Sequence, residues 1–180
     1  PMQEGSHEAE RTMDRARNAG YTREAVTRVR DEDADGVPVR IYHPSPGAVL
    51  PALVYFHGGG WVIGDLETHD HICRKLANVV ACVVIAVDYR LAPEHPFPTP
   101  LDDCYTALNW VTKKAPQLGI IPDKIAVGGD SAGGNPSAAI SPKARDENGP
   151  AICPQLPRYT VTNPRFKTPT PHTNDGASSA

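Results

Sequence analysis

The sequence predicts an α/β fold with a mostly parallel sheet, and three observations support this fold class. Wholly apolar runs at 51–56 and 81–87 are typical of strands that are buried on both faces. Segments in which apolar residues recur at helical spacing alternate with these runs. A Gly-rich turn joins a short apolar run at 124–127 to an Ala-rich segment. The resulting β-α-β-α-β-α order indicates a parallel sheet flanked by helices.

The composition bounds what the protein binds and where it works. The chain has 180 residues, enough for one domain with a real core, and its net charge of −3 comes from mixed charges. This balance indicates no nucleic-acid partner, and no stretch approaches the roughly 18 apolar residues of a membrane span. Four cysteines without C-x-x-C spacing favour reduced thiols in a cytoplasmic protein. Because the chain starts at Pro1 rather than Met, a removed signal peptide is also compatible with it.

The N-terminal segments predict a helix followed by a hairpin. Residues 6–18 are polar and contain alanines, which predicts a short helix with little core of its own. Alternating residues at 24–29 predict a strand, and 37–42 predicts its partner. The acidic segment 31–36 between them ends in Asp-Gly, a strong hairpin signal.

The middle of the chain predicts two helices on either side of the second apolar strand. Apolar spacing predicts a helix over 68–80, before that strand, and the Pro-rich loop 88–98 follows the strand. Thr99 as N-cap and Pro100 at the first helical position then predict a second helix, which Pro116 closes.

The Gly-rich turn at 128–134 contains Gly129-Asp130-Ser131-Ala132-Gly133, which fits G-x-S-x-G between a strand and a helix. In that context the motif forms a nucleophile elbow, and the small glycines allow the tight turn. The turn would hold Ser131 Oγ at the carboxyl end of the strand, where a general base can reach it. An ordinary Gly-rich β-α turn is the alternative, because such short motifs often match by chance.

A second glycine cluster, His57-Gly58-Gly59-Gly60-Trp61, directly follows the first apolar strand. Consecutive glycines let backbone N–H groups face a ligand without Cβ obstruction, which makes an anion-binding nest. The alternative is a flexible turn. The occurrence of this glycine cluster together with the serine motif favours an anion-binding nest over a flexible turn.

Histidines and carboxylates crowd one region but do not form a convincing metal site. His57, Asp65, His69, Asp70 and His71 are close in sequence. His69 and His71 are two residues apart and would not share a helix face, and no tetrahedral ligand set is visible. We therefore predict no metal site in this region.

Three charged side chains, Asp88, Arg90 and Glu94, lie in the Pro-rich loop. Opposite charges at this spacing can form ion pairs that stabilise a loop. We interpret them as an ion-pair brace for that loop rather than as catalytic groups.

The two glycine motifs and the Pro-rich loop together resemble one enzyme family. The blocks at 57–61, 88–97 and 128–134 occur in the order found in the hormone-sensitive-lipase-like esterases, also called bacterial family IV lipolytic enzymes. The span 52–135 resembles these enzymes almost throughout. The resemblance implies the α/β-hydrolase fold and a carboxylic ester hydrolase, an esterase or lipase that favours short acyl chains. It implies a small-molecule ester substrate and no cofactor.

The same resemblance assigns roles to residues of the two motifs. It makes Ser131 the nucleophile, which forms an acyl-enzyme. It places the oxyanion hole at the N–H groups of Gly58, Gly59 and Gly60, with Gly59 and Gly60 favoured, and at the N–H of Ala132. Two alternatives remain: a non-hydrolytic ligand-binding member of the same fold, as in plant hormone receptors, and a catalytically incomplete fragment.

The sequence after the serine departs from the family pattern. The family places an Asp in a D-P-x motif and then a His after the nucleophile. Here His172 precedes Asp175 in a polar tail, so we do not accept them as members of the triad. The catalytic acid and base therefore stay unassigned, and we expect this chain to lack both.

Prolines form the second departure. Pro136, Pro142, Pro154 and Pro157 stand where the family usually has leucine or another apolar helix former. Pro136 and Pro142 predict a strained or kinked helix after the serine. The segment 158–162 resembles the next strand of the family.

These observations divide the chain into three segments. Residues 1–20 resemble the N-terminal segment that helps to build a cap over the acyl pocket. Residues 21–165 form the N-terminal part of a catalytic domain, and 166–180 are a polar tail. We make no prediction of the oligomeric state.

Overall fold

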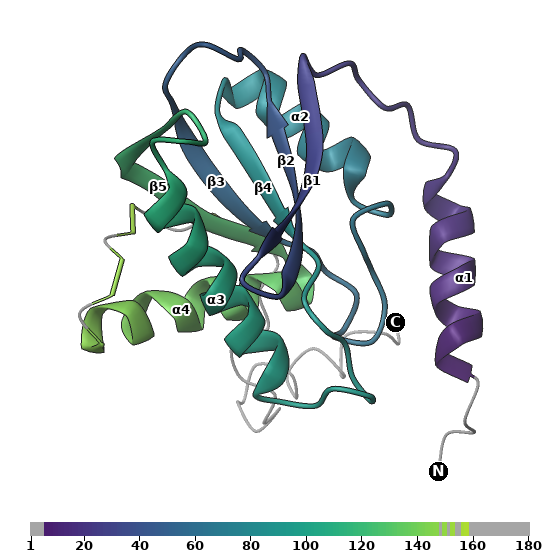
Figure 1. The fold of residues 1–180 in the computed structure, drawn as a ribbon. Helices are drawn as coiled ribbons and strands as arrows, with labels where there is room; N and C mark the ends of the chain where they lie inside the picture. The colour runs from purple at the N-terminus through teal and green to yellow at the C-terminus, as the bar shows by residue number, and fades with distance from the viewer. Residues whose placement is uncertain (1–5, 148, 151, 154–155, 159–180) are drawn as a thin grey trace, which may run out of the picture.

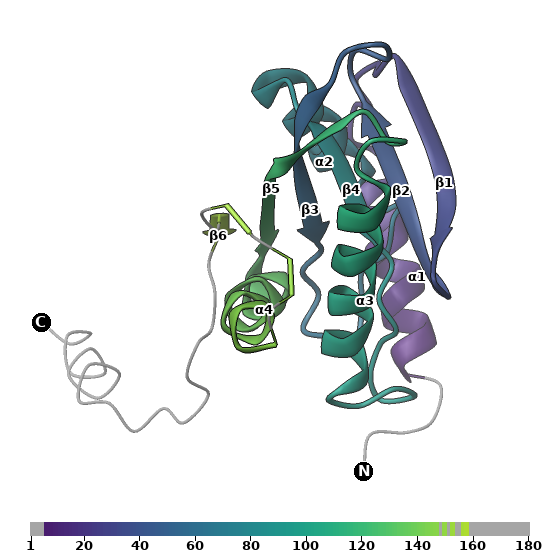
Figure 2. The same cartoon turned by 60° about the vertical axis from the view of Figure 1, so that its left-hand side comes forward.

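A six-stranded mixed sheet forms the centre of the computed structural model, which describes residues 6–147, 149–150, 152–153 and 156–158. The strand order is β1-β2-β4-β3-β5-β6 (Figures 1 and 2). The last four strands in this order run parallel, while β1 and β2 pair antiparallel. The predicted α/β fold is therefore confirmed. The elements are α1 (Ser6–Asn18), β1 (Arg28–Ala34), β2 (Val37–His43), β3 (Leu50–Phe56), α2 (Asp70–Val80), β4 (Val83–Val87), α3 (Thr99–Lys114), β5 (Ile120–Asp130), α4 (Gly134–Asp146) and β6 (Leu156–Arg158).

The two apolar strands β3 and β4 are buried because helices cover both faces of the sheet (Figure 2). Side chains alternate between the faces of a strand. Val54 and Phe56 belong to the larger core, together with residues of α3 and α4, and Leu53 and Tyr55 belong to the smaller core with α2. Both faces of these strands therefore need apolar side chains, which explains the continuous runs in the sequence.

The first strand of the hairpin was predicted wrongly, because β1 begins at Arg28 rather than Glu24. The turn consists of Asp35 and Gly36 alone, so the acidic residues before them lie in the strand. Both turn residues have positive φ, 55° and 94°, as a type I′ turn requires. β1 is an edge strand whose side chains are mostly exposed. Such a strand needs no apolar alternation, so its sequence resembles that of a polar loop.

The start of α3 also differs from the prediction. Thr99 is the first residue of the helix rather than its N-cap, and the flanking residue is Pro98, without a side-chain cap. Asp102 in the first turn still complements the positive end of the helix dipole. α2 begins at Asp70, two residues later than the apolar spacing predicts.

The prediction of strain at Pro136 is wrong. A 3-10 turn over Ser131–Gly133 separates β5 from α4, so the α-helix starts at Gly134 and Pro136 falls in its first turn. The N–H groups of a first turn have no helical partner, so a proline there removes no helical hydrogen bond. Pro142, in contrast, lies inside α4.

Some predictions fall outside the described residues. They concern Pro154, the residues after Arg158 in the segment 158–162, and the tail 166–180, which includes His172 and Asp175. β5 is longer than predicted, and the described part of β6 pairs with it in parallel register.

We predict that Pro142→Ala stabilises the fold, because an interior proline costs about 3 kcal/mol relative to a good helix former. The melting temperature followed by circular dichroism should rise by several degrees. Pro136→Ala is the matched control and should bring no such gain, since its position needs no N–H donor. Equal gains from both substitutions would show that α4 does not begin where the structure places it.

Candidate active site

The predicted elbow exists, and Ser131 occupies its tip. Ser131 is exposed at the carboxyl end of β5 and has a φ of 48°, in the left-handed region that few non-glycine residues adopt. A Cβ atom at Gly129 or Gly133 would lie 2.2 Å or 2.0 Å from the carbonyl oxygen of Phe56. Both positions therefore require glycine, because the end of β3 passes directly against the turn. A strained residue fixed by such close packing is typical of functional sites.

The glycine loop after β3 folds against the same end of the sheet. Gly59 and Gly60 have φ values of 122° and 61°, and the Gly59 carbonyl accepts hydrogen bonds from the N–H groups of Val62 and Ile63 at 3.1 and 3.0 Å. A Cβ atom at Gly59 would lie 2.1 Å from the Ile63 carbonyl oxygen, whereas a Cβ at Gly60 would meet open space. Within the described part of the chain, the Gly59 and Gly60 N–H groups donate to no protein acceptor. Both are therefore free to face a ligand.

Gly58 differs from its two neighbours, which corrects one residue of the predicted oxyanion hole. Its N–H donates to Asp130 Oδ1 at 3.0 Å, so it is not available to an oxyanion. The same carboxylate oxygen accepts the Tyr55 hydroxyl at 2.6 Å, and His69 Nε2 lies 3.6 Å from it. Burial would raise the pKa of Asp130, but these polar contacts outweigh it and lower the pKa to about 2. The carboxylate is therefore charged at neutral pH and ties the glycine loop to the elbow.

Ala132 is the remaining candidate donor. It is the second residue of the 3-10 turn that leads into α4, and it is buried. The first N–H groups of a helical run lack partners inside the helix. The Ala132 N–H is therefore placed next to Ser131 as a donor with no helical acceptor.

An aromatic shell fixes the start of the glycine loop. The buried His57 ring stacks on Tyr89 with centroids 4.3 Å apart, and the Tyr89 hydroxyl donates to the His57 carbonyl at 2.6 Å. His57 Nδ1 lies 2.7 Å from the Gly58 carbonyl, and burial lowers the pKa of the ring to about 4. The ring is thus neutral at pH 7 and donates from Nδ1. Sequence reasoning missed Tyr55 and Tyr89; the position of Tyr89 in the Pro-rich block was the one available signal.

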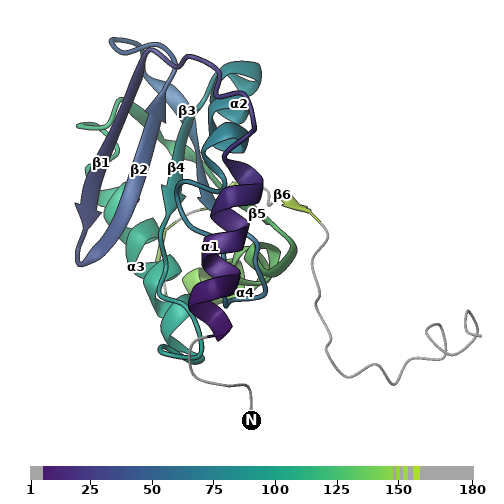
Figure 3. The ribbon, with the colours of Figure 1, turned by 90° about the vertical axis from the view of Figure 1, so that its right-hand side faces the viewer.

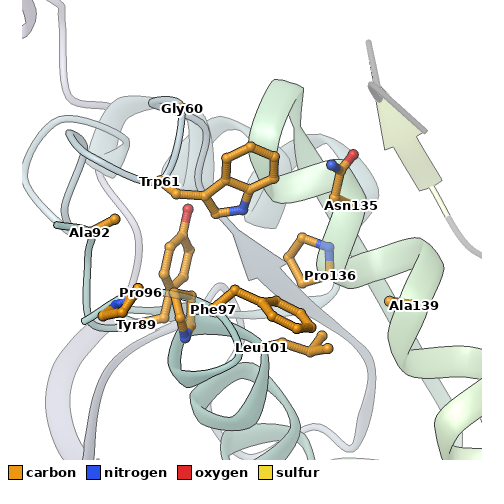
Figure 4. Close-up of a pocket in the computed structure, with 11 residues that line it drawn as sticks. Gly60, Trp61, Tyr89, Ala92, Pro96, Phe97, Leu101, Asn135, Pro136 and Ala139 are labelled. Carbon is orange, nitrogen blue, oxygen red and sulfur yellow. The ribbon is translucent and has the colours of Figure 1, made fainter. Parts of the chain in front are cut away.

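An apolar pocket of about 390 Å³ opens beside Gly60. Figure 4 shows the side chains of Trp61, Phe97 and Leu101 around it, with Pro136 of α4 on another side. Ser131 does not line the pocket, although α4, which begins three residues after it, contributes to the wall. The pocket is suited to an apolar group of a ligand that reaches the elbow.

The histidines of the glycine-loop region have structural neighbours rather than a metal geometry. His71 stacks on Tyr21 with centroids 4.3 Å apart, while His69 faces the Asp130 carboxylate. Among the residues that the structure describes, no group of three His, Cys, Asp or Glu side chains is arranged to hold a metal ion.

The ion-pair brace of the Pro-rich loop is confirmed for Arg90 and Glu94, whose partners lie on other elements, but not for Asp88. Arg90 forms a forked contact with Asp103 of α3, at 2.9 and 2.7 Å. Glu94 pairs with Arg11 of α1 at 2.7 Å. Asp88 belongs to neither pair, and burial raises its pKa to about 6. The loop is therefore held to two helices at once.

The elbow, the glycine loop and the sheet order together correspond to one known family. A family profile described as alpha/beta hydrolase fold matches residues 53–179. The chain belongs to the α/β-hydrolase family. The matched region contains both glycine motifs and the Pro-rich loop.

Named relatives of this α/β-hydrolase chain are esterases. Over 127 residues it is 50% identical to the carboxylesterase NlhH of Mycobacterium tuberculosis and 47% identical to an arylesterase of Saccharolobus solfataricus. These matches cover 70% and 71% of this chain and 40% of each relative. The solved structure of EstE1, a thermostable carboxylesterase from a metagenomic library, matches with a TM-score of 0.85 at 40% identity, over 97% of this chain and 61% of that one. The chain thus spans about 40% of the length of the curated relatives it matches.

We predict that Asp130→Asn reduces the loss of unfolding free energy that occurs as the pH becomes acidic. The folded-state pKa of Asp130 lies below its ordinary value, so its charge stabilises the fold above about pH 4, and this contribution is lost as the pH falls toward about 2. Urea unfolding at several pH values should show a smaller loss of unfolding free energy in the variant over that range. Identical slopes in both proteins would contradict the assignment.

Proposed function

We propose that the protein is a carboxylic ester hydrolase with Ser131 as its nucleophile. The observation that carries this proposal is the hydrogen bond from the Gly58 N–H to Asp130, 3.0 Å long. It holds the glycine loop against the elbow, so that the free N–H groups of Gly59 and Gly60 are at the same end of the sheet as Ser131. Nucleophile and oxyanion donors in one place are what acyl transfer requires. The esterase names of the relatives support the same reaction.

The proposed mechanism proceeds through an acyl-enzyme. Ser131 Oγ attacks the ester carbonyl carbon while a general base takes its proton. The Gly59, Gly60 and Ala132 N–H groups stabilise the negative oxygen of the tetrahedral intermediate. Collapse of the intermediate breaks the bond to the alcohol, which leaves with the proton. Water then hydrolyses the acyl-serine by the same steps, and no metal or cofactor takes part.

The base and its orienting acid are not assigned. The resemblance to the hormone-sensitive-lipase-like esterases implies that the acid and the base both follow the nucleophile in the chain, first an Asp and then a His. His172 and Asp175 have the reverse order, and we do not propose them. The described histidines nearest the site are engaged with structural partners, His57 with Gly58 and Tyr89.

For the substrate, we propose an ester with a short acyl chain. The apolar pocket of about 390 Å³ beside Gly60 supports this, because it offers a limited apolar volume next to a candidate oxyanion donor. We further propose that α1 is part of a cap over this region, since Arg11 of α1 contacts the loops that follow β3 and β4.

The proposed location is the cytoplasm. All four cysteines are free thiols, and Cys73, Cys82 and Cys104 are buried. Burial raises the pKa of each of these three thiols, which makes them unreactive. Separately, no helix in the described part of the chain has the length and apolar character needed to cross a membrane.

A fluorophosphonate probe and p-nitrophenyl butyrate test the proposed function. In a full-length protein that supplies the base, we expect the probe to label Ser131, and we expect Ser131→Ala to abolish both labelling and hydrolysis. Labelling without turnover would indicate a serine that is activated but whose acyl-enzyme is not hydrolysed. An unlabelled wild type would instead support the ligand-binding alternative, because an unactivated serine does not react.

We predict that Gly59→Ala lowers kcat more than Gly60→Ala. The new methyl group at Gly59 would lie 2.1 Å from the Ile63 carbonyl, so the loop must move, while Gly60 has open space around it. Loss of one oxyanion donor costs roughly 100- to 1,000-fold in kcat in a comparable site. Steady-state kinetics of p-nitrophenyl butyrate hydrolysis by the full-length protein measure both variants. A Gly60→Ala enzyme that is the more impaired of the two would reverse the assignment.

A further inference from the structure

The Arg11 guanidinium joins three distant parts of the chain. Its Nε donates to the Val62 carbonyl at 2.8 Å, and Nη2 donates to the Ala92 carbonyl at 3.1 Å. Nη1 and Nη2 also donate to the two carboxylate oxygens of Glu94, at 3.0 and 2.7 Å. The side chain is only 20% exposed. One side chain of α1 thus contacts both the segment after the glycine loop and the Pro-rich loop.

The contacts of Arg11 flank a strained residue. Trp61 has a φ of 64°, a conformation that a bulky residue rarely adopts and that needs support from its surroundings. Its carbonyl accepts the Ala92 N–H at 2.8 Å, and this bond connects the two loops. Arg11 binds the next carbonyl along, at Val62, and the Ala92 carbonyl on the other side. The guanidinium therefore bridges the two loops on either side of Trp61, the residue that directly follows Gly60.

Charge rather than apolar packing holds α1 on these loops. Figure 3 shows α1 in front of the loops that follow β3 and β4. A charged cleft of about 420 Å³ lies in this region, and Arg11, Arg15, Asp65 and Glu94 are among the residues that line it. Arg15 forms an ion pair with Asp65, while Met13 of the same helix is 54% exposed. The position of α1 therefore depends on its arginines.

We propose that Arg11 is a positioning residue for the glycine loop, residues 57–61. By holding Trp61 and Val62 against the Pro-rich loop, it fixes the direction in which the preceding N–H groups of Gly59 and Gly60 point. A planar guanidinium is needed, because its fork reaches two carbonyls and a carboxylate together, whereas a lysine ammonium has no such geometry. The catalytic part of this role rests on the proposed function; the anchoring of Trp61 does not.

Acrylamide quenching of tryptophan fluorescence tests the anchoring. Trp61 is 38% exposed and Trp110 is 6% exposed, so quenching reports mainly on Trp61. We expect Arg11→Met to increase quenching, Arg11→Lys to give an intermediate value, and Glu94→Gln to stay near the wild type, because Arg11 then keeps both carbonyl contacts. Arg17→Met is the matched control, since Arg17 is exposed on the same helix and forms no ion pair among the described residues.

Kinetics of p-nitrophenyl butyrate hydrolysis by the full-length protein test the catalytic consequence. Arg11→Met should lower kcat roughly 10- to 100-fold and leave KM within about twofold, because only transition-state binding suffers. Arg11→Lys should lose less activity than Arg11→Met, and Arg17→Met should keep the wild-type values.

Three results would overturn the proposal. They are unchanged quenching in Arg11→Met, an equal rise in Arg17→Met, and altered quenching without any change in kcat. A full-length wild type that hydrolyses no ester would refute the proposed function instead, and quenching would still decide whether Arg11 anchors Trp61.

Discussion

The candidate site depends on the hydrogen bonds that the Asp130 carboxylate accepts. It directly precedes Ser131 in sequence, and it takes hydrogen bonds from the Gly58 N–H and the Tyr55 hydroxyl. A fixed negative charge beside a site for an oxyanion would oppose catalysis if it faced the same space. Here the charge is directed at the loop's own donor, and His69 lies 3.6 Å away. The hydrogen bonds from Gly58 and Tyr55 thus organise the loop and partly compensate the field of the carboxylate.

The meeting of the two glycine motifs follows from the order of the strands. β3 and β5 are neighbours in parallel register, with Phe56 opposite Gly129. Parallel neighbours end at the same edge of a sheet, so residues about 70 positions apart in sequence come together there. The backbones then approach so closely that the Phe56 carbonyl leaves no space for a Cβ at Gly129 or Gly133. The glycines are therefore a packing requirement of this strand pair as well as a feature of the turn.

Local patterns predicted the parts of the site that depend on local backbone geometry. Ser131 and Gly59 were identified from their glycine-rich surroundings, and both have the positive φ that such motifs provide. The sequence could not show that the Gly58 N–H is occupied, because its acceptor lies 72 residues away. Nor could it show where α4 begins, because the 3-10 turn after β5 moves Pro136 into the first turn of the helix. Long-range contacts and exact helix starts therefore mark the limit of the sequence-based predictions.

Two neighbouring spaces of opposite character share the loops of the site. The pocket beside Gly60 is apolar, with Trp61 and Phe97 in its wall, whereas the cleft near α1 contains Arg11 and Glu94. Charges close to an apolar pocket would hold water there and weaken its affinity for an acyl chain. Because the ion pairs lie on the α1 side of the loops, charge can set the loop conformation while the pocket stays apolar. The backbone between Gly60 and Val62 is therefore the place where the electrostatic docking of α1 meets the wall of the apolar pocket.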